Sequence, residues 1–304
     1  MNQTMRDYLR VGIIHFMAYP STIGGEGPIL ETLKKIVVDD YFDAVSVTWM
    51  KDPEVRRRAR RLLEESHMEV SYGAHPRLLS QGLNVNDLDE DRRRKALETL
   101  KKGIDEACEL GASSFVFLSG PWQPETREDA FQRLVESTRE LCGYAAAKGD
   151  LRVVHENFDQ DIDKKSLIGP TSLALRYAKE ITENCNHFGL LVDLSHIPLI
   201  GEGPNEALRP VKDHLVSVDI GNCVMRDPSL PRYGDTHPRF GFPGGENDVP
   251  QVVEFLKTLL DMGFLNREKP PVVSFEVRPS ADEDPEAVIA NAKRTLNEAW
   301  TRIE

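Results

Sequence analysis

The amino-acid sequence predicts a (β/α)8 TIM barrel. Short apolar runs occur eight times along the 304 residues and alternate with helical patterns, and no Gly-rich dinucleotide motif follows the first run. Eight-fold alternation of strand and helix over about 250 residues is typical of this barrel. No Pro/Ser-rich linker or low-complexity tract divides the chain, so we expect a single barrel domain over residues 1–304.

The apolar runs are short, rich in β-branched residues and bounded by Gly, Pro, Asp or Asn, which favours strands over helices. Their near-continuous apolar character suits a parallel sheet that is covered on both faces. The expected strands cover residues 11–16, 43–49, 68–74, 113–119, 151–157, 188–194, 214–220 and 270–277.

Helical patterns fill the segments between these strands. Asp52 followed by Pro53 is typical of an N-cap and a first helical position, and predicts a helix that runs through Glu65. Further helices are expected over residues 89–110, 126–148, 171–184, 249–262 and 284–302.

The composition excludes several classes of function. Fifty acidic against 38 basic residues give a net charge of -12, which argues against nucleic-acid and anionic-membrane binding because both rely on clustered positive charge. No apolar run approaches the roughly 18 residues of a membrane span, and the N-terminus lacks the apolar stretch of a signal peptide. The four cysteines are scattered without a C-x-x-C pair, so we expect reduced thiols and a cytoplasmic protein.

A carboxylate terminates each of the last four expected strands: Glu156, Asp193, Asp219 and Glu276. In a TIM barrel these positions converge on the C-terminal mouth, where active sites lie. One such acid often caps a helix or pairs with an arginine, but four close together repel one another unless they bind a cation. We therefore expect one divalent metal ion, Mn²⁺ first, with Mg²⁺ or Co²⁺ possible, because the ligand set is rich in oxygen.

Other side chains near the strand ends are candidates for catalysis or substrate contact. His196 follows Asp193 by three residues, which makes it a candidate catalytic group. An isolated histidine or tryptophan is more often structural, but in a barrel mouth it could contact a substrate, and a tryptophan could stack on a sugar ring. The substrate-binding candidates are His15, Trp49, His75, Trp122, His155, His237 and Arg278.

These motifs resemble the xylose-isomerase-like TIM-barrel superfamily of sugar isomerases and epimerases. The matching pieces are Glu156, the segment Asp193-Leu-Ser-His196, residues 234–246, and the segment Ser-Phe-Glu276-Val-Arg278. The resemblance implies one divalent metal held by Glu156, Asp193, a residue of the seventh strand and Glu276.

The chain departs from the family pattern at the seventh strand. Where the family usually has His-x-His, this sequence has Ser217-Val-Asp219, so Asp219 is either a ligand or lies behind the ligands. Asp235 and His237 match an Asp-x-His element that binds additional zinc in the endonuclease relatives. The other histidines of a trinuclear zinc site are not evident, and the net charge disfavours DNA.

The resemblance implies isomerisation or epimerisation of a keto-sugar by proton removal next to a carbonyl. Glu156 and Glu276 would act as general base and acid, and His196 would hydrogen-bond a substrate oxygen. No Gly-rich phosphate loop follows the last strands, which favours an unphosphorylated sugar or glycoside.

Two alternatives stay open. The same chemistry could eliminate the aglycone from a 3-oxo-glycoside, because the chain also resembles the large subunits of C-glycoside deglycosidases, which act with a small β-rich partner subunit. The long segments 15–28 and 221–248 give room for an aryl-bearing substrate or such a partner. The third alternative is a sugar-binding barrel that has lost its chemistry, which the departure at Asp219 favours. Barrels of this type also often form homo-oligomers.

Overall fold

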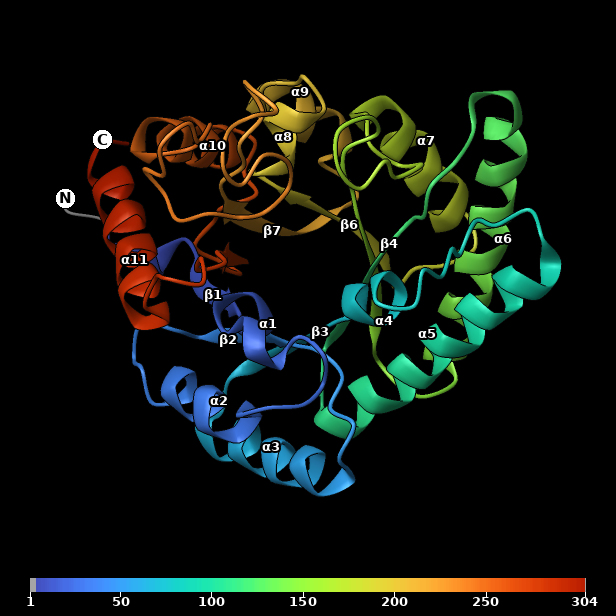
Figure 1. The fold of residues 1–304 in the computed structure, drawn as a ribbon, viewed down its shortest axis with the longest axis horizontal. Helices are drawn as coiled ribbons and strands as arrows, with labels where there is room; N and C mark the ends of the chain where they lie inside the picture. The colour runs from blue at the N-terminus through green and yellow to red at the C-terminus, as the bar shows by residue number, and fades with distance from the viewer. Residues whose placement is uncertain (1–3, 304) are drawn as a thin grey trace.

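A closed barrel of parallel strands forms the centre of the computed structural model, which describes residues 4–303 (Figure 1). Strands that are consecutive in sequence are neighbours in the barrel, and the last strand pairs with the first. The strands are β1 (Arg10–Ile14), β2 (Ala44–Val47), β3 (Glu69–Gly73), β4 (Ser114–Leu118), β5 (Arg152–Glu156), β6 (Phe188–Asp193), β7 (Leu215–Gly221) and β8 (Val272–Glu276). The predicted (β/α)8 barrel is confirmed, and no observed strand extends more than one residue beyond its expected range.

Helices surround the barrel on its outside (Figure 1). The longer ones are α2 (Ile29–Val37), α3 (Pro53–Ser66), α5 (Glu90–Leu110), α6 (Arg127–Ala146), α7 (Thr171–Thr182), α10 (Val249–Asp261) and α11 (Pro285–Thr301). Short helices are α1 (His15–Ala18), α4 (His75–Leu79), α8 (His196–Leu199) and α9 (Pro204–Leu208), with 3-10 turns at Met5–Asp7, Pro20–Thr22, Pro124–Thr126 and Arg209–Val211. The predicted cap of α3 is confirmed, because the Asp52 side chain accepts a hydrogen bond from the backbone N–H of Glu54. Within residues 4–303, no helix is both long and apolar enough to cross a membrane.

The two faces of the strands carry different side chains. On the outer face, residues such as Val11, Val45, Phe115 and Phe275 are fully buried between the barrel and its helices. Many positions on the inner face carry small residues, most of them serines: Gly12, Ser46, Ser71, Ser114, Ser217 and Ser274. Large branched residues usually fill the interior of a TIM barrel, so these small residues leave the interior of this one partly hollow. The runs that read as near-continuously apolar in the sequence are therefore apolar mainly on their outer face.

Candidate active site

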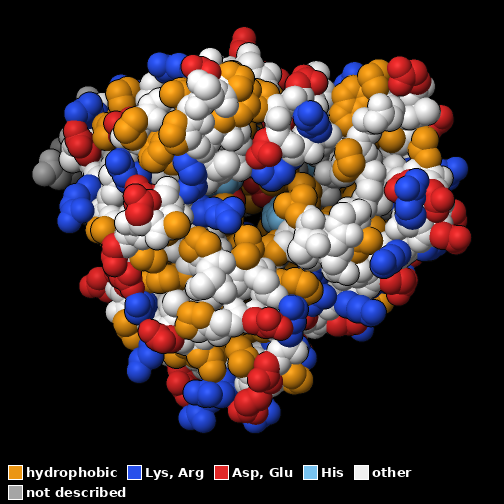
Figure 2. Space-filling model, viewed as in Figure 1, with side chains coloured by type: hydrophobic (Ala, Val, Ile, Leu, Met, Phe, Trp, Pro, Cys, Tyr) orange, Lys and Arg blue, Asp and Glu red, His pale blue; other side chains and the backbone are white. Residues whose placement is uncertain are grey.

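Three carboxylates meet at the C-terminal mouth of the barrel. Glu156 ends β5, Asp193 ends β6 and Glu276 ends β8, and each offers an oxygen within 4.8 Å of the other two. All three side chains are buried, and one oxygen of each (Oε1, Oδ2 and Oε2 respectively) has no hydrogen-bond partner among the described residues. In the space-filling view, a hollow opens at the centre of this face, with acidic and histidine side chains inside it (Figure 2). Buried carboxylate oxygens without donors are a suitable ligand set for a hard divalent cation.

The carboxylates also perturb one another. Burial, together with the negative charges of Glu156 and Asp193, raises the pKa of Glu276 well above its usual range. Without a cation, Glu276 therefore tends to hold a proton, because two ionised neighbours make a third charge unfavourable.

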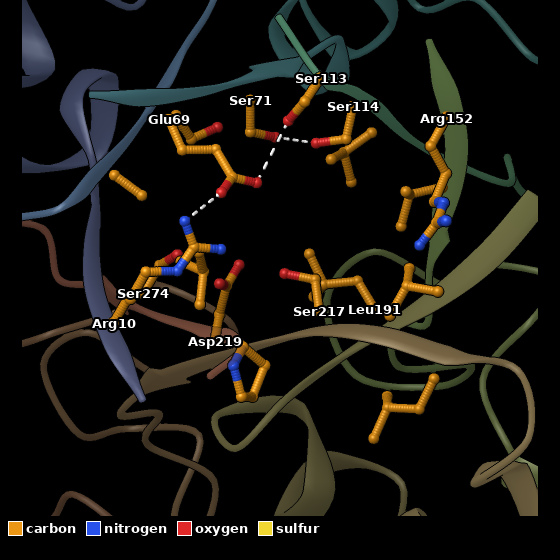
Figure 3. A pocket seen from close by; sticks show the side chains of 18 of the residues that line it. Arg10, Glu69, Ser71, Ser113, Ser114, Arg152, Leu191, Ser217, Asp219 and Ser274 are labelled. Atoms are coloured by element: carbon orange, nitrogen blue, oxygen red, sulfur yellow. Dashed lines mark hydrogen bonds and ion pairs between the residues drawn. The ribbon is translucent and has the colours of Figure 1, made fainter. Parts of the chain in front are cut away.

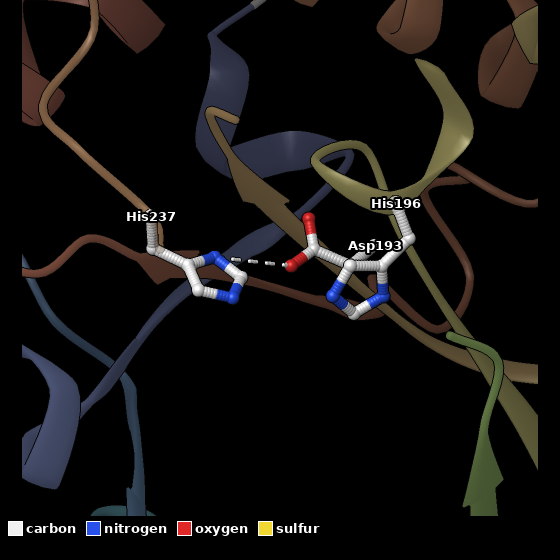
Figure 4. A group of neighbouring side chains, drawn as sticks. All are labelled: Asp193, His196 and His237. Atoms are coloured by element: carbon white, nitrogen blue, oxygen red, sulfur yellow. Dashed lines mark ion pairs between the residues drawn. The ribbon is translucent and has the colours of Figure 1, made fainter. Parts of the chain in front are cut away.

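His237 stands beside these carboxylates. Its Nε2 lies 3.4 Å from Glu276 Oε1. Its Nδ1 lies 3.8 Å from Asp193 Oδ2, and Figure 4 shows this pair. Gly221, the last residue of β7, makes this approach possible, since a Cβ there would lie 3.1 Å from His237 Nδ1 and 2.6 Å from the Glu276 carbonyl oxygen. A histidine thus reaches the carboxylates from the long segment after β7 rather than from β7 itself.

Asp219 lies deeper in the barrel than Glu276. In the strand register, Asp219 pairs with Ser274, whereas Gly221 pairs with Glu276. Its side chain belongs neither to the group of three carboxylates nor to the group of Asp193, His196 and His237, the two sets of described residues that could share a metal ion. Burial and the nearby Glu156 and Asp193 raise its pKa well above the usual range, although the Ser274 hydroxyl donates to it. Metal ligation by Asp219 therefore stays a prediction.

Asp235 connects two histidines of the site. Its Oδ1 lies 2.9 Å from His237 Nε2 and 3.2 Å from His196 Nε2, and its side chain is almost fully buried. The other ring nitrogen of His196, Nδ1, lies 2.8 Å from the carbonyl oxygen of Asn157. His196 begins α8, so the turn after β6 brings its ring over the mouth. Nδ1 of His196 is therefore hydrogen-bonded, whereas its Nε2 lies beside the Asp235 carboxylate without making a hydrogen bond.

The charge of this histidine follows from its surroundings. Burial alone would lower the pKa of His196, but the Asp235 carboxylate, with Asp193 and Glu156, outweighs burial and raises it to about 10. In return, the histidines and Lys164 hold the pKa of Asp235 well below its usual range, although burial opposes them. These carboxylates thus favour the protonated form of His196, whose Nδ1 is hydrogen-bonded to Asn157 and whose Nε2 has no hydrogen-bond partner among the described residues.

Lys164 is a further site residue, and no sequence pattern marks it. Its Nζ lies 3.0 Å from Asp235 Oδ2 and 2.9 Å from Asp163 Oδ2. The loop after β5 holds it there, because the buried Asp159 carboxylate accepts backbone hydrogen bonds from Ile162, Asp163 and Lys164. Burial would lower the pKa of Lys164, but the two aspartates outweigh that effect and raise it. Lys164 therefore supplies a fixed positive charge behind Asp235.

His75, Phe158 and Phe16 form a wall of the mouth beside Glu156 and His196, which we call the phenylalanine wall. His75 begins α4, and its Nε2 lies 3.1 Å from Glu156 Oε2. The Phe158 ring lies 4.3 Å from that of His196 and 5.7 Å from that of His75. Phe16 lines the cavity next to them. This wall combines a polar edge with apolar ring faces, which suits a sugar.

Two of the predicted substrate-binding residues, His155 and His15, point away from the mouth. His155 faces the outer helices, where its ring packs 5.2 Å from Phe117 and 4.9 Å from Tyr177, and burial lowers its pKa to about 3. Since alternate strand residues point to opposite faces, the inward direction of Glu156 forces His155 outward. His15 also points away from the mouth, because its Nε2 lies 2.8 Å from Thr32 Oγ1 of α2. Neither histidine is placed to touch a substrate.

The rings of both predicted tryptophans already contact other residues of the protein. Trp49 Nε1 donates to the carbonyl oxygen of Ile23, and the Arg77 guanidinium lies 5.4 Å from its ring. The guanidinium of Arg127 lies 5.1 Å from the Trp122 ring. Neither tryptophan is among the residues that line the cavity, so stacking on a sugar stays a prediction.

Below the carboxylates, a cavity of about 560 Å³ continues down the barrel interior. Serine hydroxyls line it, and Ser114 donates to Ser71 at 2.9 Å (Figure 3). At its far end, Arg10 Nη1 pairs with Glu69 Oε2 at 2.6 Å, and Arg152 stands close by. Apolar side chains such as Val116, Val154 and Leu191 share this lining with the serines, so the cavity has a mixed polar and apolar wall.

Comparisons with known proteins agree with this architecture. The model of the xylose isomerase-like TIM barrel family matches residues 37–299. No curated protein matches the chain in a sequence comparison.

Three solved structures illustrate the similarity. A D-tagatose 3-epimerase-like protein is 17% identical with a TM-score of 0.71, and the match covers 97% of this chain and 100% of that chain. A 3-keto-D-glucoside 4-epimerase from E. coli is 18% identical with a TM-score of 0.67, covering 95% of this chain and 99% of that chain. The IOLI protein with a bound zinc atom is 15% identical with a TM-score of 0.72, covering 97% and 99%. These likenesses show the fold, and the family match extends over most of the sequence. The chain belongs to the xylose isomerase-like TIM barrel family.

Proposed function

We propose that this protein is a divalent-metal-dependent sugar isomerase or epimerase that moves a proton at the carbon next to a carbonyl. The observation that carries the proposal is the cluster of Glu156, Asp193 and Glu276, three buried carboxylates with oxygens within 4.8 Å of one another at the barrel mouth. The similarity to sugar epimerase structures supports a sugar as the substrate.

The chemistry of the donor set fits a metal ion. Glu156, Asp193 and Glu276 would hold it, with His237 as the nearest further donor and Asp219 as a candidate from below. Carboxylate oxygens favour Mn²⁺, with Mg²⁺ and Co²⁺ as alternatives. A divalent cation supplies Lewis acidity, which polarises the substrate carbonyl and offsets the negative charge that develops on its oxygen.

The protein's own residues would then move the proton. Glu156 and Glu276 come from different strands and act as general base and acid on one carbon. His75, 3.1 Å from Glu156 Oε2, orients that carboxylate. His196, fixed by the Asn157 carbonyl oxygen, hydrogen-bonds a substrate oxygen. The rings of the phenylalanine wall exclude water while the proton is away from carbon.

Hydrogen exchange in D₂O tests this proposal. Protein loaded with Mn²⁺, Mg²⁺ or Co²⁺ is incubated with a panel of keto-sugars, and NMR follows both deuterium at the α-carbon and the product. We expect metal-dependent exchange that Glu156→Gln and Glu276→Gln each abolish and that His155→Phe, a control outside the mouth, retains.

Three results would count against it. No exchange across the panel with any of these metals would refute the proton transfer. Release of the aglycone from a 3-oxo-glycoside would instead identify the elimination reaction, which the comparisons do not support at present. Retention of less than one equivalent of metal would indicate a barrel without catalytic chemistry.

A further inference from the structure

Two arginines stand together at the barrel mouth without a carboxylate partner. Arg232 Nη2 donates to the carbonyl oxygen of Arg278 at 2.9 Å, and Arg232 Nη1 lies 3.0 Å from Ser280 Oγ. Arg232 also donates to the Thr236 carbonyl oxygen, so all these acceptors are neutral. The Arg278 side chain is exposed and pairs with no residue among those described. The nearby Glu283 pairs with Arg239 at 2.9 Å instead.

The position of Arg278 relates it directly to the candidate active site. It follows Glu276, the last residue of β8, by two residues, so it lies just beyond the strand end at the mouth of the barrel. Its backbone N–H donates to the His237 carbonyl oxygen at 2.6 Å, which ties it to the loop beside the carboxylates. Lys and Arg side chains border the hollow on this face of the molecule (Figure 2).

Arg232 and Arg278 lack a carboxylate partner among the described residues, although the chain is acidic. Its net charge is -12, and other arginines of the same region pair with acids, as Arg226 does with Glu246. Burial and the positive charge of Arg278 lower the pKa of Arg232, even though Glu283 opposes them. The two positive charges of Arg232 and Arg278, held close together by backbone contacts, attract an anion to the solvent-facing side of the pair.

We propose that Arg278, held by Arg232, binds an anionic group of the substrate, so that the site takes an acidic sugar in preference to a neutral one. This inference rests on the proposed function for its sugar substrate. A carboxylate is the favoured group, because the donors of Arg232 are engaged and the single free fork of Arg278 matches two carboxylate oxygens. A sugar phosphate shares this chemistry and is the second source that the experiment distinguishes.

Binding measurements that need no turnover test the inference. Calorimetry on the Mn²⁺-loaded protein compares 5-keto-D-gluconate, D-fructose 6-phosphate and neutral D-fructose. We expect an acidic ligand to bind at least about tenfold more tightly than fructose, the size of one charge-assisted hydrogen-bonded contact. Arg278→Met should remove that preference, so that the acidic ligands bind no more tightly than fructose, and Arg278→Lys should restore part of it. Arg226→Met, an exposed arginine paired with Glu246, is the matched control and should retain it.

The outcomes separate the two proposals. Preference for the carboxylate or the phosphate ligand identifies the anion, provided that Arg278→Met abolishes it. Equal binding of all three ligands, or a preference that survives in Arg278→Met, overturns the inference. Arg278-dependent selectivity without α-hydrogen exchange would support the inference and refute the proposed reaction. Exchange without charge selectivity would support the proposed reaction and refute the inference.

Discussion

Glu276→Gln tests whether the carboxylate cluster is a metal site. Because one oxygen of each carboxylate lies within 4.8 Å of the others, each pair of ionised carboxylates repels by at least about 3.5 kcal/mol at an effective dielectric constant of about 20, or roughly 10 kcal/mol or more for three pairs. The metal-free protein avoids most of this cost by keeping a proton, which is why the pKa of Glu276 is raised. Glutamine keeps the shape and removes the charge. We therefore expect metal-free Glu276→Gln to be more stable than wild type at pH 8 by about 1–3 kcal/mol, or roughly 2–6 °C in Tm.

The pH dependence has a definite sign. A carboxyl whose pKa is raised by folding keeps a proton in the folded protein that the unfolded chain has released, so stability falls as pH rises above about 4.5. The advantage of Glu276→Gln should therefore grow from pH 5 to pH 8 and vanish near pH 4. In Mn²⁺ the wild type should be the more stable protein. The ion neutralises the carboxylate cluster of the wild type, whereas in the variant it has one ligand fewer.

Thermal unfolding followed by circular dichroism, in EDTA and in Mn²⁺, measures both effects. Glu254→Gln, an exposed position on α10, is the control and should behave as wild type does in both buffers. The reasoning is refuted if Glu276→Gln is the less stable protein in EDTA at pH 8. It is equally refuted if Mn²⁺ raises the Tm of both proteins by the same amount.

Three further changes follow from the site. Asp219→Asn should retain one equivalent of metal by elemental analysis, since the other carboxylates and His237 suffice; loss of the metal would make Asp219 a ligand. Lys164→Met leaves the buried Asp235 without its ammonium partner, so urea unfolding should show a loss of at least about 2 kcal/mol, which Lys164→Arg partly restores; an unchanged midpoint would contradict the pairing. His155→Phe should keep the catalytic rate and should lose less stability in acid than the wild type does. The reason is that the pKa of His155, lowered to about 3 in the folded state, makes the stability of the wild type fall as pH drops below about 6.5. If the urea midpoint of the variant falls between pH 7 and pH 4.5 as much as that of the wild type, this explanation is wrong.

The barrel and its carboxylates were predictable because both depend on local patterns. Short, near-continuous apolar runs with helical patterns between them specify the strands, and a polar residue at the end of such a run must reach the mouth once the barrel closes. Glu156, Asp193 and Glu276 could be placed together on this ground alone, although their spacing could not.

Tertiary structure decided the rest of the site. Whether His155 or Glu156 faces inward depends on a one-residue parity that an apolar run does not reveal, and the depth of Asp219 depends on how β7 is staggered against β8. The long segment after β7 carries no periodicity, so only the folded chain shows that it brings His237 and Asp235 against residues from β6 and β8. The sequence thus determined the barrel and the acids at its mouth. The fold decided which charge balances Asp235, because Lys164 reaches it through a contact between loops that are far apart in the sequence.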